Sequence, residues 1–290
     1  RWAPRIQRGR TGGSEDGMKA AARKATDDPP WWPDLRRRRV RDEWMDDPAL
    51  DPTEHARALA GLERINRISL VGPQVWRLVR PIAEERARMG RTLRLMDVAC
   101  GGGDLLTTLG RRCRDAGLAC ELTACDISAT ALERAGEMAK RARLDIRTLQ
   151  RDVLRESTPD RAGFEDDDRT AWDVVTCSLF LHHIEAIDDI VHLLVRARQL
   201  AGRRLIVGDL RRTRLGHVMA SLGSRALSRS PVVHFDAPVS VEAALTKAEL
   251  TSCAKNAGLE GARIVNAWPQ RMMLVWDRAD GDASREGRAT

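Results

Sequence analysis

The sequence predicts an α/β protein in which a mostly parallel sheet is covered by helices on both faces. From residue 91 onwards, short apolar runs alternate with stretches of helical periodicity. A Gly-rich turn joins the first apolar run to the helical stretch that follows it, and two closely spaced apolar runs near the end can pair as an antiparallel hairpin. Such alternation is typical of parallel sheets with crossover helices, whose ligands bind at the carboxyl ends of the strands.

A helical region is expected before the sheet. Asp51-Pro52-Thr53-Glu54 combines a capping side chain, a proline in the first turn and an early acid, which is a helix-start signature. Apolar residues follow at helical spacing as far as Ile65, and a second helix is expected over 73–89, ended by Gly90. We expect residues 31–90 to form a helical lid over the ligand site. The expected contributors to its pocket are Arg64, Arg67 and the Trp31–Trp32 segment.

The remaining elements follow in order between residues 91 and 277, which we expect to form one ligand-binding domain. The polar, acidic residues 155–170 are expected to be a surface loop, and residues 1–30 and 278–290 a disordered and a flexible tail. Seven strands are predicted, at 93–98, 120–125, 145–150, 172–177, 204–207, 263–267 and 272–276, with helices at 104–115, 128–143, 187–200, 214–227 and 247–257.

The composition disfavours several classes of protein. The chain has 290 residues, of which 42% are hydrophobic and 31% charged, so it can bury a large core. It has no apolar stretch of about 18 residues and no charged-then-apolar leader, so we expect neither a membrane span nor a secretory signal. Its six cysteines lack framework and metal-ligand spacing, which predicts reduced thiols in a cytoplasmic protein without a metal site.

The positive charge is concentrated outside the expected domain. The net charge is +7, yet residues 1–45 hold 12 Lys and Arg against 7 Asp and Glu, which leaves the rest of the chain nearly neutral. A broad phosphate-binding face is therefore not expected, and neither is a nucleic-acid partner.

The strongest chemical signal is the turn after the first strand. The strand ends in Asp97, and Gly101, Gly102 and Gly103 follow before a helix that begins with Asp104. Glycines let the backbone turn sharply and approach a ligand closely, and the amides at the helix start favour a carboxylate or phosphate. We therefore expect a ligand at this turn; the alternative is a tight turn without one.

Two further acids follow the next two strands. Asp126 ends the second strand, where a carboxylate can bind both hydroxyls of a ribose; it is equally well placed to cap the next helix. Asp152 follows the third strand and can meet an adenine amino group.

This constellation resembles the class I S-adenosylmethionine-dependent methyltransferases, which have a Rossmann-like fold. Asp97, Gly101 and Gly103 are similar to the family's first motif, Asp126 to its ribose acid and Asp152 to its adenine-side acid, and residues 172–183 to its fourth-strand motif. The likeness covers about residues 91–276 and implies S-adenosylmethionine as cofactor. It assigns cofactor contacts to Asp97, Ala99, Cys100, Gly101, Gly103, Asp104, Asp126, Ile127, Asp152, Val153 and Ser178. Cys100 has no base partner in the sequence, so we expect it to be a small packing residue rather than a nucleophile.

Details within the motifs indicate which class of acceptor compound to expect. Ala99-Cys100-Gly101-Gly102-Gly103-Asp104 is most similar to the ubiquinone/menaquinone branch, but His182-His183 stands where the quinone enzymes have Asn-Arg. Asp209-Leu210-Arg211-Arg212 and residues 44–48 resemble methyltransferases that accompany aromatic polyketide pathways. We expect O-methylation of a small aromatic or polyketide-like hydroxyl compound, with quinone-type C-methylation as the alternative.

Methyl transfer to a hydroxyl requires a base, and histidine is the natural one near neutral pH. His182 is the favoured base, and His183 and His234 are the other candidates; the two adjacent histidines can also be purely structural. His234 lies where relatives insert a substrate loop.

Three alternative functions are also compatible with the sequence. A nicotinamide-dependent dehydrogenase needs Gly-x-Gly-x-x-Gly, and Leu106 stands where its third glycine belongs. Methylation of RNA or protein is disfavoured by the near-neutral core and by Ser178-Leu179-Phe180 in place of an Asn-Pro-Pro-Tyr turn. A non-catalytic binder of the same fold is the third. The oligomeric state is expected to be monomer or homodimer.

Overall fold

The structure is a computed structural model that describes residues 33–47, 49–154 and 172–279. Residues 38–290 group as one compact unit, separate from residues 1–37, and the description below concerns that unit. The expected N-terminal tail, the Trp31–Trp32 segment, the loop at 155–170 and most of the C-terminal tail lie outside the described residues.

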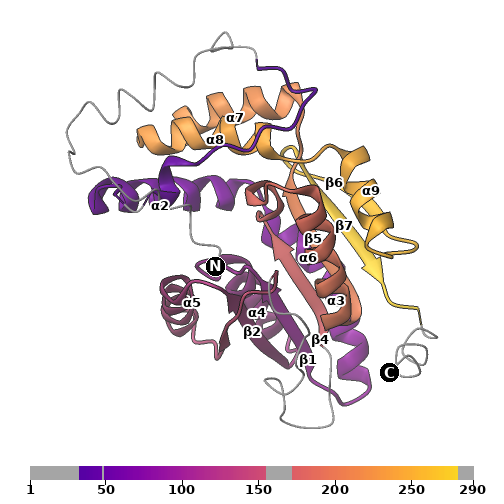
Figure 1. Cartoon of the computed structure of the whole chain (residues 1–290). Helices are drawn as coiled ribbons and strands as arrows, with labels where there is room; N and C mark the ends of the chain where they lie inside the picture. The colour runs from indigo at the N-terminus through magenta and orange to yellow at the C-terminus, as the bar shows by residue number, and fades with distance from the viewer. Residues whose placement is uncertain (1–32, 48, 155–171, 280–290) are drawn as a thin grey trace. The chain divides into compact units, whose positions relative to one another are not determined.

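A single seven-stranded sheet forms the centre of the unit, in the order β3-β2-β1-β4-β5-β7-β6 (Figure 1). Strands β1 to β5 pair in parallel, and β7 is antiparallel to both β5 and β6. The predicted fold class is therefore confirmed. The strands are β1 (Leu93–Val98), β2 (Cys120–Asp126), β3 (Arg147–Gln150), β4 (Trp172–Ser178), β5 (Ala201–Leu210), β6 (Arg263–Ala267) and β7 (Arg271–Asp277).

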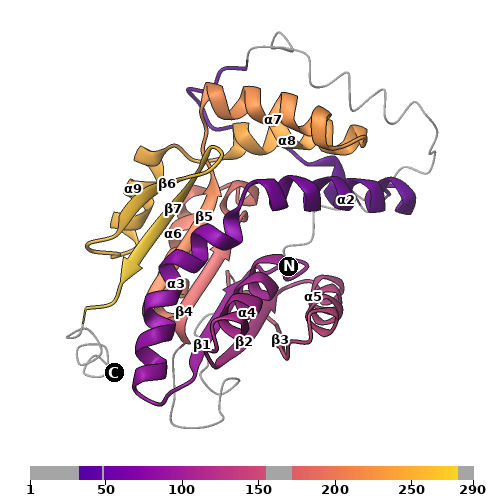
Figure 2. The ribbon, with the colours of Figure 1, turned by 180° about the vertical axis from the view of Figure 1, so that it is seen from behind.

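Helices cover both faces of the sheet (Figures 1 and 2). Side chains alternate across β1, so that Leu93 and Leu95 join the core beneath α3, α4 and α5, whereas Met96 and Val98 join the core beneath α6 and α9. The helix bounds are α3 (Val71–Arg88), α4 (Asp104–Asp115), α5 (Ala129–Arg141), α6 (Ile187–Leu200) and α9 (Lys247–Asn256).

A third group of helices lies beyond one end of the sheet: α2 (Pro52–Ile68), α7 (Arg214–Leu227) and α8 (Pro231–Ala243) (Figures 1 and 2). Asp51 caps α2 as expected, because its carboxylate accepts the backbone N–H groups of Thr53 and Glu54. Of the two N-terminal helices, only α2 belongs to this group. Val75 and Val79 of α3 are buried in the same core as β1, so the core continues across the expected boundary at residue 90. A lid role for the region before it stays a prediction.

One helix was not expected, and one strand is longer than expected. Residues around His234 were expected to lie in a substrate loop, yet they form α8. Its buried residues lie on nearly every side, among them Val232, Val233 and Val239, so the sequence has no polar face from which a helical period could be recognised. The strand expected at 204–207 extends over Ala201–Leu210, because pairing with both β4 and β7 accommodates its polar residues.

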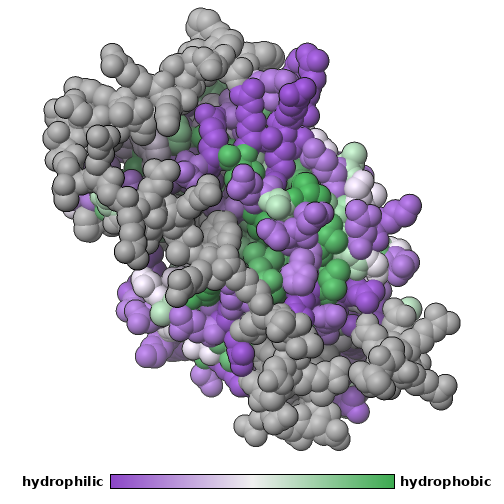
Figure 3. All heavy atoms as spheres, viewed as in Figure 1, coloured by the Kyte–Doolittle hydropathy of each residue, from purple (hydrophilic) through white to green (hydrophobic). Residues whose placement is uncertain are grey.

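The surface is mixed in character. On the face seen in Figure 3, hydrophobic residues near the middle are bordered by hydrophilic ones. Among the described residues, no helix combines the length and the apolar character needed to cross a membrane.

Candidate active site

The turn between β1 and α4 has a backbone that only small residues adopt easily. Gly101 and Gly103 have φ values of 52° and 79°, and Gly103 occupies the N-cap position of α4 in the left-handed region. A Cβ added at Gly101 meets no atom within 4 Å. The turn therefore leaves open space beside its backbone, as a bound cofactor needs.

Asp126 joins the ends of β1 and β2. Its Oδ2 accepts the N–H of Gly101 at 2.9 Å, and its Oδ1 accepts the N–H of Ser128 at 2.9 Å. The alternative role of Asp126 as a helix cap is wrong, because Ser128 caps α5 by accepting the N–H of Ala131. Asp126 therefore holds the Gly-rich turn against the second strand and presents its carboxylate at their shared edge.

Asp97, at the end of β1, is a buried carboxyl group with 2% of its surface exposed. Burial raises its pKa to about 7, against the opposing effect of Thr176, whose hydroxyl donates to Asp97 Oδ1 at 2.6 Å; the nearby Asp126 raises the pKa further. The end of β1, just before the Gly-rich turn, therefore carries a carboxyl group that loses its proton near neutral pH.

Replacing Asp97 with asparagine should remove a pH dependence of stability. The folded-state pKa lies above the ordinary 3.8, so the protonated form stabilises the fold at low pH, and this contribution is lost as the pH rises through about 7. At about 1.4 kcal/mol per pKa unit, the loss is on the order of 4 kcal/mol. Urea unfolding of both proteins without cofactor, between pH 4 and pH 8, measures it. Equal pH dependence in the two proteins would contradict the assignment.

The other expected cofactor contacts lie around the same edge of the sheet. Cys100 is buried, and burial together with Asp97 raises the pKa of its thiol, which agrees with a packing residue rather than a nucleophile. Asp152 Oδ1 accepts the N–H of Leu154 at 3.0 Å. Five other expected contacts also follow or end strands at this edge: Ala99 in the turn, Asp104 at the start of α4, Ile127 after β2, Val153 after β3 and Ser178 at the end of β4.

His182 lies in a short 3-10 helix, Leu181–His183, directly after β4. It is 5% exposed, and its Nδ1 is 2.7 Å from Oδ1 of Asp209 near the end of β5. The same carboxylate accepts the backbone N–H of His182 through Oδ2 at 3.0 Å. Because a carboxylate accepts, Nδ1 carries the hydrogen, and Nε2 is left to face the site.

The electrostatics of this pair make the imidazole of His182 a stronger base than an ordinary histidine. Burial lowers the pKa of His182, but the charge and hydrogen bond of Asp209 outweigh it, so the pKa is raised overall. Glu43 adds to this effect and Arg271 opposes it. The imidazole holds the pKa of Asp209 below its usual range, although burial alone raises that pKa.

Glu43 lies near the histidines but belongs to residues 38–45, a segment far away in the sequence. Arg38 fixes the start of this segment by donating to the carbonyl oxygens of Ile184 and Ala243, each at 2.6 Å. The end of the segment is fixed by the backbone N–H groups of Trp44 and Met45, which both donate to the buried carboxylate of Asp236 on α8. Ser240, also on α8, donates its hydroxyl to Oε1 of Glu43. Glu43 is therefore held through its own side chain and through the backbone of the two residues that follow it.

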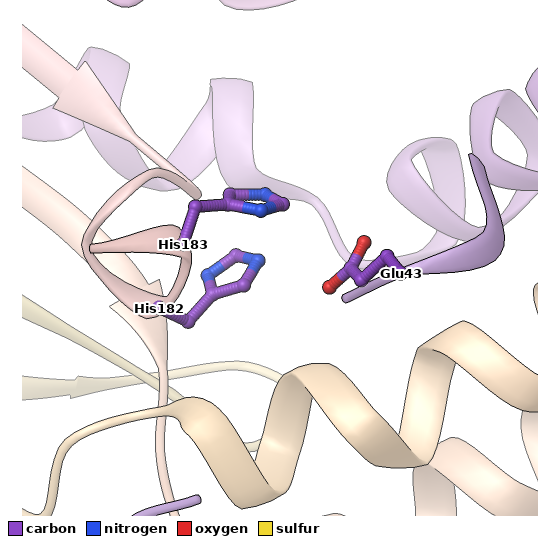
Figure 4. A group of neighbouring side chains, drawn as sticks. All are labelled: Glu43, His182 and His183. Carbon is purple, nitrogen blue, oxygen red and sulfur yellow. The ribbon is translucent and has the colours of Figure 1, made fainter. Parts of the chain in front are cut away.

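The three side chains of Glu43, His182 and His183 form one cluster. Each has a nitrogen or oxygen atom within 4.8 Å of those of the other two, and the two imidazole rings have centroids 4.2 Å apart. Figure 4 shows the two rings and the carboxylate directed toward a common space from opposite sides. We call this group the His–Glu cluster.

The third expected base, His234, lies in α8, and its Nε2 is 2.8 Å from the carbonyl oxygen of Ser228. The structure therefore gives it a contact within its own helical group and does not bring it into the His–Glu cluster. Arg64, expected at the acceptor pocket, donates to the carbonyl oxygen of Leu227 at 2.8 Å. The side chain of Arg67 lies outside the described residues.

A cavity of about 790 Å³ lies elsewhere, between residues 38–41, the start of α6 and α9. Its lining includes Arg39, Arg41, Ile187 and Ser252 and contains none of the expected cofactor contacts. Arg41 pairs with Glu242. We therefore place the chemistry at the carboxyl ends of β1, β4 and β5 rather than in this cavity.

Two members of the site were missed from the sequence. Asp209 could have been found, because it follows an apolar strand, and the carboxyl ends of neighbouring parallel strands meet at one edge. Glu43 carries no such signal, since its segment is an irregular, charged stretch before the first long helix.

Comparisons with known proteins agree with this fold. Residues 96–203 match the model of a methyltransferase domain. A protein from Nostoc punctiforme assigned as an O-methyltransferase has a similar structure, with a TM-score of 0.55 and 18% identity over 91% of this chain and 68% of that one. An O-methyltransferase family 2 protein from Planctomyces limnophilus, solved with apigenin, has a TM-score of 0.51 and 16% identity over 81% of this chain and 64% of that one. A comparison with curated protein sequences finds no match.

The matched segment runs from the end of β1 into β5, so the chain contains a methyltransferase domain. The matched domain and the fold support an S-adenosylmethionine-dependent methyltransferase.

Proposed function

We propose that the protein transfers a methyl group from S-adenosylmethionine to a hydroxyl oxygen of a small aromatic or polyketide-like compound. The observation that carries this proposal is the buried pair of His182 and Asp209 at the carboxyl ends of β4 and β5. β4 lies beside β1 in the sheet, so the pair and the Gly-rich turn share one edge.

The donor side of the site is proposed to consist of the Gly-rich turn and the acids that follow the first three strands. The open space at Gly101 lets the cofactor approach the backbone closely. Asp126 binds the ribose hydroxyls, and Asp152 faces the adenine. Asp97 shapes the turn from beneath, where it is buried. S-adenosylmethionine supplies an electrophilic methyl group on a sulfonium.

The acceptor side is proposed to activate the hydroxyl through His182. Asp209 fixes the tautomer, so that Nε2 can take the hydroxyl proton. The oxygen forms a bond to the methyl carbon as the carbon–sulfur bond breaks, and the proton goes to Nε2. Positioning and exclusion of water supply the rest of the rate enhancement; the segment carrying Glu43 and the α2, α7 and α8 group are proposed to contribute that closure.

Product analysis tests the proposed function directly. The full chain is incubated with S-adenosylmethionine and a panel of small phenols and polyketide-like hydroxyl compounds, and the methylated atom is assigned by NMR. We expect methyl ethers. A product methylated on carbon would contradict the proposal and favour the quinone-type alternative.

Replacing Asp126 with alanine should weaken cofactor binding at least roughly tenfold, which corresponds to about 1.4 kcal/mol. The variant loses the proposed bonds to ribose, each worth roughly 1.5–3 kcal/mol, and also the support of the Gly101 N–H. Calorimetry with S-adenosylhomocysteine measures the change. Glu133→Ala is the control, because Glu133 is exposed on α5; equal affinity of the two variants would argue against the ribose assignment.

A further inference from the structure

We propose that the His–Glu cluster binds one divalent transition-metal ion of the zinc type, and that the ion coordinates the acceptor hydroxyl. The inference rests on the proposed function for the identity of the acceptor. It goes beyond that function by assigning a metal site to residues Glu43, His182 and His183, which methyl transfer with His182 as a simple base does not require.

The donor set fits such an ion. Two imidazole nitrogens and one carboxylate oxygen are ligands that Zn²⁺ and related ions prefer. Ligands at about 2.0–2.2 Å from a tetrahedral ion lie about 3.4 Å from one another. The donor atoms here lie within 4.8 Å of one another, so each separation must shorten by at most about 1.4 Å to reach that spacing. Three protein ligands leave a position open for water or substrate.

Outer contacts hold two of the three ligands in place. Asp209 accepts from Nδ1 of His182, which is the carboxylate–histidine arrangement that orients metal-bound imidazoles. Ser240 donates to Oε1 of Glu43, which leaves Oε2 for an ion. A base needs one histidine and one carboxylate partner, whereas the structure gathers a second histidine and a second carboxylate at the same point.

The charges near the cluster come from two carboxylates and two guanidinium groups. Glu43 and Asp209 lie close to His182, and Arg271 and Arg38 are the opposing positive charges. Glu43 comes from the segment before the first long helix, and the histidines follow β4. An ion therefore joins this segment to the edge of the sheet.

The ion changes how the hydroxyl is activated. With the ion bound, Nε2 of His182 is a ligand, and the ion lowers the pKa of the coordinated hydroxyl, whose proton passes to solvent water. Without the ion, Nε2 is the base of the proposed function. The two activation modes use the same residue and the same acceptor position.

Titration of the chelator-treated full-length protein with Co²⁺, followed by visible absorption, tests the site. We expect saturation at one ion with bands of four- or five-coordinate Co²⁺, and a further change of the bands when a phenol is added. Glu43→Gln and His183→Gln should each weaken Co²⁺ binding at least roughly tenfold. Glu260→Gln and His192→Gln change exposed residues of the same types outside the cluster and should leave the affinity unaltered.

Any one of four results would overturn the inference. These are absence of the bands, equal Co²⁺ affinity in all variants, loss of binding in His192→Gln alone, and bands that do not change when phenol is added. Its failure is distinguishable from that of the proposed function. Methyl ether formation that continues unchanged in excess chelator leaves the proposed function standing and removes the ion. Co²⁺ binding at the cluster in a protein that forms no methyl ethers keeps the ion and contradicts the proposed function.

Discussion

Replacing His182 with alanine is expected to lower turnover of an unactivated phenol by roughly 10²- to 10⁴-fold, the usual contribution of proton transfer by a positioned side chain. The variant removes the group that we propose to activate the acceptor, whether Nε2 acts as base or as a ligand of an ion. It also leaves Asp209 buried without its imidazole partner. Steady-state kinetics with a phenol of ordinary acidity measure the loss, and circular dichroism checks that the variant folds.

Two comparisons make this experiment selective. A nitrophenol that is already ionised at the assay pH needs no activation, so its methylation should fall far less in His182→Ala. His192→Ala, on the exposed side of α6, should keep the activity of the natural protein with both phenols. Equal turnover of the unactivated phenol in His182→Ala and His192→Ala would show that another group activates the acceptor.

Replacing Gly103 with valine is expected to abolish measurable cofactor binding and to destabilise the fold. A Cβ at this position lies 2.8 Å from Cβ and 3.1 Å from Cα of Ala135 on α5, so the helix itself must move. The φ of 79° is also strained for a residue with a side chain. Overpacking costs roughly 1–3 kcal/mol, and the left-handed conformation costs roughly 1–2 kcal/mol more.

Gly102 provides the matched control for this variant. A Cβ there meets nothing within 4 Å, and its φ lies outside the strained range. Gly102→Ala should therefore keep the stability of the natural protein, as measured by urea unfolding, and any loss of cofactor affinity in it reports contact with the ligand alone. A Gly103→Val protein that unfolds at the same urea concentration as the natural protein would contradict the packing argument.

The elements on either side of the Gly-rich turn could be predicted from the sequence almost to the residue. β1 and α4 begin and end where their patterns indicate, because a buried strand and an amphipathic helix each carry their own period. The Gly-rich turn could be predicted for the same reason, since its geometry depends on residues that are consecutive in the chain. The fold class followed from the alternation of such local signals.

Two features of the fold could not be predicted from local sequence patterns: the helix α8 and the position of α3. α8 is buried on nearly all sides, so no periodicity marks it. α3 was grouped with α2 because both precede the sheet, yet the contacts of Val75 and Val79 place it in the core beside β1. Which face of a helix is buried can be read from its sequence, but the surface that buries it cannot.

The sequence by itself determined the fold class, the order of the strands along the chain and the residues of the Gly-rich turn, since each depends on neighbours within a few positions. Only the tertiary structure decided which groups surround His182. Asp209 arrives there because β5 lies beside β4, and Glu43 because Asp236 and Ser240 of α8 hold its segment. The His–Glu cluster is assembled by contacts between distant segments, and burial and charge at such contacts leave no period in the sequence.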